Sequence, residues 1–592
     1  MAAESVISPG VFMQENDQSI ITQGPIEVGA AIVGPTVVGP TNRPTVVTSY
    51  SQYKSIFGAT FVSGGIAYEY LTSIAALNYF EQGGDSLLVT RVGSGSYSPA
   101  TASIPSAGYG SILPSFELET LSYGEILNNT DAGTLAKGAL PSGSSANIRW
   151  EISSVDTTTG LFSLNIRSGD DIATNKSILE TWTALSLDPN QNNFISYVLG
   201  DQRQNPQQDE YGNWYLQYSG SYMNKSRFVR VSAVNTPTPS YFNSLGYPAS
   251  GHYTASLPQL GSGSLNGGFS GAEGALFGGL VGTAAAYPLN MFDTITLVPS
   301  AHTIDNTQGL AGSDYDLAIN LLKNKDAYDF NVIYVPGLTS QNAPNQIQEI
   351  LDLSQNRGDC IAVIDTVGYS QRISEVVSRA SIYDNSYAAT YWPWLQVRSR
   401  ETGKMNFVPA STLVPAVYEY NDKVSAEWFA PAGLNRGGLS VALQPERRLS
   451  QSERDLLYNA KINPIASFPG VGTVIYGQKT LQSRASALDR VNVRRLLIAL
   501  KAYIGQIGEQ LLFEPNTQVT RNKFLNQVNP YLEYVQQRQG LYAFQVVMDE
   551  TNNTPDVIDR NQLVGSIYLQ PTRTAEFITL DFNILPTGAT FG

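Results

Sequence analysis

The order of secondary-structure signals between residues 330 and 365 is the feature that most constrains the fold. The apolar runs FNVIYV at 330–335 and CIAVID at 360–365 predict two buried strands, and residues 345–357 between them carry a helical pattern. Strand, helix and strand at this spacing predict a parallel βαβ unit, because parallel strands need a crossover connection. Further strands are expected at 86–92 and 292–298, and a helix at about 65–82. The fold class is therefore α/β in the core.

A long stretch of different composition interrupts this core. From Gly93 the chain becomes rich in Ser, Gly, Pro and Tyr. Residues 96–185 alternate short apolar strands with Asn, Gly and Ser turns, which predicts an outer β-rich insertion, and residues 186–284 are irregular and predict a second insertion. The core is then discontinuous and consists of residues 23–95 plus 285–442. Both insertions are expected to protrude from it.

Residues 443–592 predict an α+β domain of helices followed by a sheet. Helices are expected at 450–460, 488–512 and 521–539, and strands at 544–549, 563–569 and 576–585. The last strand alternates cleanly and places four apolar side chains on one side, Ile578, Leu580, Phe582 and Ile584. On the long helix, Arg490, Arg494 and Lys501 fall within about 40° of each other at 100° per residue. They are interpreted either as a solvated polar face or as a basic stripe that faces a tube or a neighbour.

The N-terminal residues 1–22 form an arm that cannot fold by itself. Ser8-Pro9-Gly10 breaks any helix. The arm nevertheless carries apolar side chains with no local partner sequence, namely Val6, Ile7, Val11, Phe12 and Met13. An extended segment of this kind is expected to pair with the C-terminal domain of a neighbouring chain by strand exchange.

Composition excludes several classes of function. The 592 residues include 36 Lys plus Arg and 50 Asp plus Glu, a net charge of −14, which excludes nucleic-acid binding through a global basic field. One cysteine and two histidines leave little for a zinc site or a His-dependent enzyme. Charged residues make up 15% of the chain, against roughly 25% in ordinary soluble domains. Removing water from such a surface costs little free energy, so the surface is suited to burial against partner proteins.

No motif in the chain forms a convincing catalytic or cofactor site. In residues 472–480, GTVIYGQKT, Gln478 displaces the lysine that a phosphate-binding loop requires, and the β-branched spacer favours a strand. The Gly-rich turn at 267–271 lacks a preceding strand. The remaining candidates are interpreted as incidental or as solvated strand ends, and they are His252, His302, Asp352, Asp359 and Asp365. The apolar stretch 274–292 holds four Gly, a Pro and an Asn, so membrane insertion is not expected. The chain is therefore expected to be a structural protein without a cofactor.

An ordered set of short motifs runs along the chain. The motifs are SPGVF at 8–12, GG with a further Gly at 267–271, VPG at 335–337, YWPW at 391–394, WFAPAG at 428–433, INPI at 462–465, FPGVG at 468–472, YGQKTL at 476–481, VNVRRL at 491–496 and FEPN at 513–516. In this order and spacing they resemble the motifs of the contractile tail sheath proteins of myophages. The resemblance covers residues 1–95 and about 265–592. The family usually has Trp and Arg where this chain has Tyr476 and Lys479, and residues 96–264 diverge from it.

The resemblance implies a function and a set of partners. Subunits would stack as hexameric rings around a tail tube, and contraction would drive the tube through the host envelope for genome ejection. The partners would be other copies of the chain, the tail tube protein, and baseplate and tail terminator proteins, with no nucleic acid. The protein would be located in the virion tail after assembly in the bacterial cytoplasm. The alternatives are another assembling virion protein, such as a baseplate or capsid component, and an α/β enzyme.

Overall fold

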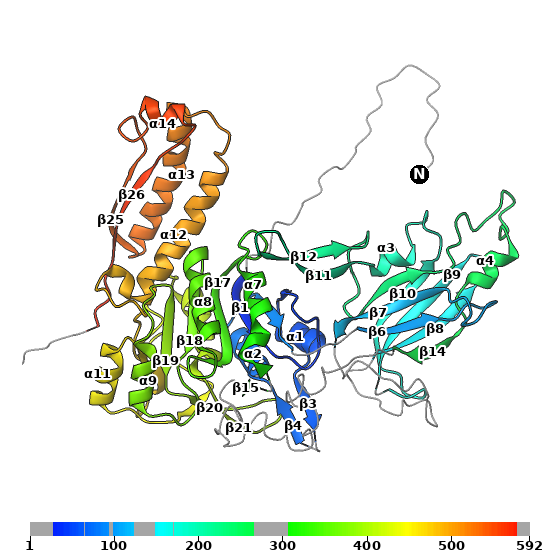
Figure 1. Cartoon of the computed structure of the whole chain (residues 1–592), viewed down its shortest axis with the longest axis horizontal. Coiled ribbons are helices and arrows are strands. Elements are labelled where there is room, and N and C mark those ends of the chain that lie inside the picture. The colour runs from blue at the N-terminus through cyan, green and yellow to red at the C-terminus, as the bar shows by residue number, and fades with distance from the viewer. Residues whose placement is uncertain are drawn as a thin grey trace, which may run out of the picture.

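The computed structural model describes residues 28–63, 66–93, 99–123, 148–169, 171–265, 306–308 and 310–576. Figure 1 shows three parts: a central α/β region, a β-rich insertion on one side, and a helical hairpin with a β-ribbon on the other. In these residues, no helix combines the length and apolarity that a membrane crossing requires. The Gly-rich turn at 267–271, the apolar stretch 274–292 and the expected strand 292–298 lie outside the described residues.

An eight-stranded sheet forms the centre of the molecule. Its spatial order is β2 (Thr45–Val47), β5 (Leu87–Arg91), β1 (Val28–Gly34), β17 (Phe330–Thr339), β18 (Ile361–Asp365), β19 (Ala388–Trp392), β23 (Asn463–Phe468) and β24 (Gly472–Ile475). The six inner strands are parallel, and the two edge strands are antiparallel to their neighbours. The predicted βαβ unit is confirmed as β17, α8 (Pro344–Arg357) and β18.

Helices cover both faces of this sheet, which explains why its strands are continuous apolar runs. Along β1, Ala30 and Ile32 belong to one core, whereas Ala31 and Val33 belong to the core on the opposite face. The first core contains residues of α1 (Tyr50–Phe57), α2 (Leu71–Glu81) and α10 (Val414–Val424). The second contains residues of α7 (Asp316–Leu322) and α8. A third, smaller cluster joins α9 (Ile373–Ala380) to α11 (Gln451–Asn459).

The helix expected at 65–82 is shorter than its apolar periodicity suggested. The segment Ile66–Glu69 is strand β4, which pairs with β3 (Thr60–Ser63), and α2 begins only at Leu71. The remaining small elements are β15 (Asn306–Thr307), β16 (Leu310–Ala311), η3 (Gly312–Tyr315), β20 (Leu395–Arg398), β21 (Met405–Val408), η4 (Ala410–Thr412), β22 (Ala442–Pro445) and η5 (Ala487–Asp489). Backbone pairing of β4 with β3 holds residues 66–69 extended, which explains why the helix begins later than expected.

The expected domain boundary at 442/443 is wrong in one respect. Strands β23 and β24 lie beyond it in sequence, yet β23 pairs with β19 and both strands extend the central sheet. Ile465 and Ile475 are fully buried in the core shared with β1 and α2. The part of the chain that leaves the central region therefore begins at about residue 490.

The two expected insertions, 96–185 and 186–284, are one folded unit over residues 99–265. Strand β13 (Val229–Val234) pairs with β7 (Phe116–Tyr123), and β14 (Gly261–Ser264) pairs with β8 (Ile148–Asp156). A single apolar core draws on both halves. The other elements of this unit are β6 (Pro99–Ile104), β9 (Leu161–Ser168), β10 (Ile178–Ser186), α3 (Ile195–Leu199), β11 (Arg203–Gln208), β12 (Trp214–Ser219) and α4 (Gly251–Ser256). These strand pairs join residues that are more than 100 positions apart, so no local pattern in the sequence indicates them. For this reason the predicted division of the insertion at 185/186 is incorrect.

Excision of the whole insertion is expected to leave the central region folded. Replacing residues 99–265 by a flexible Gly/Ser linker removes one apolar core as a unit, so the thermal midpoint should stay within about 3 °C of the full-length subunit. Deleting only 99–185, which the predicted boundaries recommend, strips β7 from β13 and β8 from β14 and should give aggregation. Circular dichroism melts of both deletions check this, and equal behaviour of the two would contradict it.

The C-terminal part is a helical hairpin that carries a two-stranded ribbon. It consists of α12 (Val491–Glu509), α13 (Gln518–Gln537), β25 (Leu541–Val547), α14 (Pro555–Asp559) and β26 (Ser566–Pro571). The helices predicted at 450–460, 488–512 and 521–539 and the strands predicted at 544–549 and 563–569 are confirmed with small shifts in their ends. The strand predicted at 576–585 lies outside the described residues except for Glu576.

Candidate functional site

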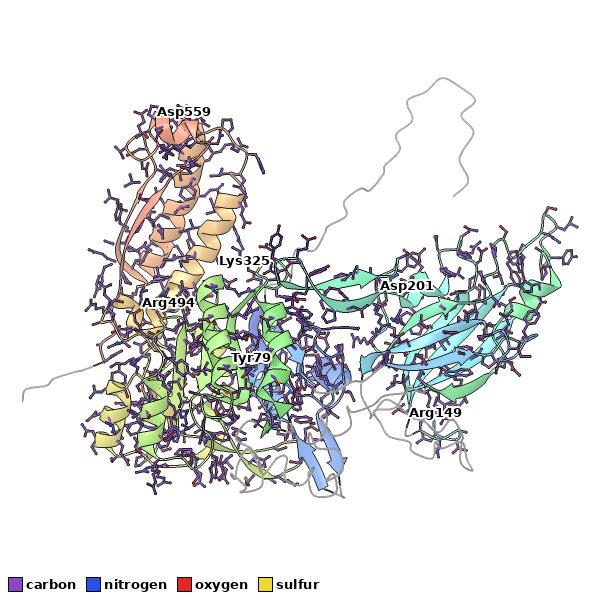
Figure 2. All side chains as sticks on the ribbon, in the orientation of Figure 1. Tyr79, Arg149, Asp201, Lys325, Arg494 and Asp559 are labelled. Carbon is purple, nitrogen blue, oxygen red and sulfur yellow. The ribbon has the colours of Figure 1, made fainter. Side chains whose placement is uncertain are left out.

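The root of α12 joins the C-terminal hairpin to the central region. Most of its first ten residues are buried, whereas its distal half is largely exposed. Leu496, Leu500 and Ile507 lie in one core with Phe524 and Val528 of α13, which fixes the hairpin as a unit. Figure 2 shows Arg494 at this junction, between the hairpin and the central sheet. Val491 and Ile498 of the same helix belong to a core of the central region, so apolar packing joins the two parts, and the charged side chains of the helix add to it.

Arg490 anchors the end of the described chain. Its Nε donates to Oε1 of Glu576 at 2.7 Å and its Nη2 donates to Oε2 at 3.0 Å. The hydroxyl of Tyr458 in α11 donates to the same carboxylate at 2.5 Å, and the Gln478 amide donates at 3.1 Å. Burial raises the pKa of Glu576, but the hydrogen bonds from Arg490, Tyr458 and Gln478 outweigh it, so the pKa is lowered. This node ties residue 576 to the start of α12 and to α11.

Arg494 is committed to an internal contact. Its side chain is 4% exposed, its Nε donates to the Ser386 carbonyl at 3.1 Å, and its guanidinium lies 3.9 Å from the Tyr387 ring centre. Lys501 is exposed, and its ammonium donates to the Tyr387 hydroxyl at 3.0 Å. The expected basic stripe is therefore wrong for Arg490 and Arg494, because both guanidiniums are used to dock the helix on its own chain. Only Lys501 presents its charge to solvent.

Arg495, the next residue of α12, makes a second buried connection. Its guanidinium forms a two-pronged ion pair with Asp422 of α10, with one N–O distance of 2.8 Å. It also lies 4.8 Å from the ring of Tyr418, whose hydroxyl contacts that of Tyr391 in β19 at 2.5 Å. Arg490, Arg494 and Arg495 together fix the start of α12 at three places: the C-terminal segment at Glu576, the loop before β19 at Ser386, and α10 at Asp422. Sequence gave no signal for the partners, which lie 73 to 108 residues away.

The ribbon of β25 and β26 presents open backbone edges. One face of the ribbon packs on α13, with Phe544, Val546, Ile567 and Leu569 partly buried, while Tyr542 and Tyr568 point to solvent. The two strands pair only with each other among the described residues. Side chains already occupy the carbonyls of Tyr542 and Val547 on β25, which accept from Gln536 and Asn552. The other outward N–H and C=O groups can pair with a further strand.

The strand-exchange candidates Val6, Ile7, Val11, Phe12 and Met13 lie outside the described residues, as do Ile578, Leu580, Phe582 and Ile584. The structure fixes the points from which both segments leave the described chain. The N-terminal arm precedes β1, an inner strand of the central sheet, and the C-terminal segment follows the Glu576 node.

The candidate catalytic residues have structural partners. Asp365 ends β18 and accepts bonds from the Ser411 amide at 3.2 Å and the Ser411 hydroxyl at 2.5 Å. Asp359 pairs with Arg357, Asp352 accepts from Gln348, and His252 contacts the Tyr109 hydroxyl at 2.7 Å. His302 lies outside the described residues. The described chain contains no group of three His, Cys, Asp or Glu residues placed to hold a metal ion.

The segment 472–480, in which the sequence argued against a phosphate-binding loop, begins with a strand, as its β-branched residues favoured. Residues Gly472–Ile475 form β24, and the Lys479 ammonium donates to the Tyr458 carbonyl at 2.9 Å. The Asn463 side chain accepts from the Lys479 amide at 2.5 Å. The lysine is thus part of the packing around α11 and β23.

Asp365 is expected to make the isolated subunit more stable in mild acid. Burial raises its pKa to about 7, while the unfolded pKa is near 4, so the folded state holds the proton more tightly. The resulting stabilisation is complete below about pH 4 and is lost at about 1.4 kcal/mol per pH unit as pH rises to 7. Asp365→Asn should therefore gain stability relative to wild type between pH 5 and pH 8. Urea unfolding at both values measures the difference, and a difference that does not change with pH would contradict the assignment. The comparison isolates Asp365, because burial also raises the pKa of Glu419 and Glu446 to about 7 in both proteins.

Two family models match adjacent parts of the chain. The phage tail sheath protein central domain matches residues 308–481, and the phage tail sheath C-terminal domain matches residues 483–585. The first span ends after β24 and the second begins just before α12, so their border coincides with the structural junction described above.

Similar proteins of known name are also tail sheath proteins, which agrees with the expectation of a structural protein and not an enzyme. The tail sheath protein of Vibrio phage KVP40 is 38% identical over 39% of this chain and 32% of its own length, and that of Enterobacteria phage T4 is 42% identical over 31% and 28%. The chain thus matches about a third of the length of these relatives. A sheath tail protein from Listeria innocua shares the fold, with a TM-score of 0.50 and 10% identity over 92% of this chain and 95% of its own. Residues 308–481 and 483–585 of this chain are therefore the central and C-terminal domains of a phage tail sheath protein.

Proposed function

We propose that this protein is the structural subunit of a contractile phage tail sheath. In this proposal the subunits stack as hexameric rings around a tail tube, and contraction drives the tube through the host envelope for genome ejection. The observation that carries the proposal is the pair of tail sheath domains at 308–481 and 483–585, the second of which holds a β-ribbon with two open edges.

The ribbon supports a particular mode of assembly. A helical polymer needs heterologous interfaces that do not close, and it needs links that survive while subunits rotate. Main-chain hydrogen bonds between strands meet this need, because they do not depend on the orientation of the rest of the subunit. We propose that the N-terminal arm of one neighbour and the C-terminal segment after Glu576 of another add strands to β25 and β26. The Arg490–Glu576 node then serves as a fixed root for the C-terminal segment.

The proposed partners follow from this arrangement. They are other copies of this chain, the tail tube protein, and baseplate and tail terminator proteins, in a virion tail that is assembled in the host cytoplasm. The insertion 99–265 projects from the central region on the side away from the hairpin (Figure 1), so it is expected to decorate the outside of the assembly.

Electron microscopy of the purified full-length chain tests the proposal. Tubes of wide bore, alone or around co-expressed tail tube, are the expected result. Closed shells would favour a capsid protein, and monomers that bind only at one end of a tail would favour a baseplate component. Either result would overturn the sheath assignment for the whole protein.

A further inference from the structure

The far end of the helical hairpin exposes an aromatic side chain that none of the described residues covers. We call residues 509–523 and 549–560 the hairpin tip; Asp559 marks its position in Figure 2. Phe513 is fully exposed there, and Leu512 and Val519 beside it are each more than 60% exposed. Exposed large apolar groups gathered at one place mark contact surfaces more often than isolated ones do.

The tip holds Phe513 in position instead of letting it fold back. Asn516 accepts from Arg521 Nε at 3.0 Å and donates to Asn553 at 3.2 Å and to the Gln562 carbonyl at 2.8 Å, which links the two loops of the tip. Phe513 itself has a φ of 67°, a left-handed conformation that is unfavourable for an aromatic residue. The exposed ring and the left-handed backbone of Phe513 both cost free energy in the free subunit. Burial of the ring in a partner would supply free energy that offsets both costs.

The charge around Phe513 is negative. The hairpin tip contains six acidic residues, Glu509, Glu514, Asp549, Glu550, Asp556 and Asp559, all of them exposed. Of its three basic residues, Arg521 is buried and Arg560 is paired with Asp556. A partner for this surface should carry exposed apolar side chains that are surrounded by positively charged residues.

A surface of the central region, near the start of α12, combines exposed apolar side chains with an excess of basic residues. We call residues 372–384 and 447–461 the basal face; they include α9 and α11, which pack together through Val376 and Leu457. Ile382 is 65% and Leu456 51% exposed on it. It has six basic and four acidic residues, and the ion pairs Arg379–Glu375 and Arg447–Glu453 leave four basic and two acidic residues outside these pairs.

The tip cannot reach the basal face of its own chain. The start of α12 lies beside the basal face, because Arg490 contacts Tyr458 of α11. The helix then runs away from it for 19 residues, about 28 Å at 1.5 Å per residue. In the left-hand part of Figure 1, α14 of the tip lies at the top and α9 and α11 lie at the bottom. Any contact between the two surfaces is therefore a contact between copies.

We propose that the hairpin tip docks on the basal face of a second copy of this chain, with Phe513 inserted beside Leu456 and Ile382. Such a head-to-tail contact is heterologous and leaves a free tip and a free basal face at the two ends, so it propagates. The proposal rests on the proposed sheath function and adds to it an interface made by folded surfaces, distinct from the strand exchange of the termini.

Assembly of the full-length chain carrying Phe513→Gly tests the aromatic contact. Glycine accepts a φ of 67° without strain, so the variant subunit should melt at or above the wild-type temperature. Its critical concentration for polymer formation, measured by sedimentation, should rise about tenfold or more, as expected for loss of a buried interfacial aromatic. The matched control is Tyr211→Gly, which removes an 88% exposed aromatic from the turn of the insertion and should assemble as wild type does.

A charge exchange identifies the partner surface. Glu514→Lys and Arg448→Glu should each raise the critical concentration, and the double variant should recover most of the loss. Absence of recovery in the double variant, or normal assembly of Phe513→Gly, overturns the proposal. If Phe513→Gly polymerises normally without tail tube but no longer assembles around tail tube, the proposal is also overturned, and the tip is then assigned to a contact with the tube. Failure of the wild-type chain to polymerise would instead contradict the proposed function.

Discussion

Removal of residues 1–20 is expected to abolish polymerisation while leaving the subunit folded. The described central sheet begins at Val28, and its core is complete without the arm. The arm itself would bury Val11, Phe12 and neighbouring apolar groups only against another chain. Pairing along one edge of the β25–β26 ribbon would contribute about 0.5–1.5 kcal/mol per hydrogen bond and about 25 cal/mol per Å² of apolar surface buried. Because this free energy is gained at every subunit of a ring, it is enough to determine whether the subunits polymerise or remain monomers.

The measurement combines sedimentation, microscopy and thermal unfolding. The truncated chain should sediment as a monomer, show neither tubes nor rings, and melt at the temperature of the unassembled full-length subunit. Phe12→Asp in the full-length chain is the matched variant, because it keeps the length of the arm and removes its largest apolar group. Normal tubes from the truncated chain would refute the strand-exchange mechanism, even though the family assignment would stand.

Replacing Arg495 by Met is expected to cost about 3 kcal/mol of unfolding free energy, because it leaves a carboxylate without its buried partner. The Arg495 side chain is 4% exposed and that of Asp422 is 17% exposed. The guanidinium also covers the Tyr418 ring at 4.8 Å. Since this group joins α12 to α10, the hairpin should loosen from the central region before the central sheet unfolds. Hydrogen exchange of α12 amides and urea unfolding of the isolated subunit measure the two effects.

Two controls separate a buried ion pair from a general loss of charge. The double variant Arg495→Met with Asp422→Leu should recover much of the stability, since both charges are then absent from the interior. Arg560→Met removes an exposed i,i+4 pair with Asp556 and should change stability by less than about 0.5 kcal/mol. Equal effects of Arg495→Met and Arg560→Met would contradict the assignment of Arg495 as the link between the two parts.

Local patterns in the sequence determined the elements that depend on near neighbours. The βαβ unit from β17 to β18, helices α11, α12 and α13, and strands β25 and β26 follow from apolar periodicity and short connections. Ordered motifs such as WFAPAG and FEPN were sufficient for the family, which the domain matches then confirmed. The same motifs determined nothing about which surfaces touch.

Tertiary structure alone decided the partners of the charged residues and the extent of the parts. Helical spacing grouped Arg490, Arg494 and Lys501, but it cannot reveal that Arg494 and Lys501 contact Tyr387 or that Arg490, the residue before α12, pairs with Glu576. Likewise, β13 and β14 complete sheets begun more than 100 residues earlier. The desolvation of a charged side chain and the pairing of a strand both depend on neighbours that are distant in sequence. The partner of each charged residue and the boundaries of each domain are therefore determined only when the chain has folded.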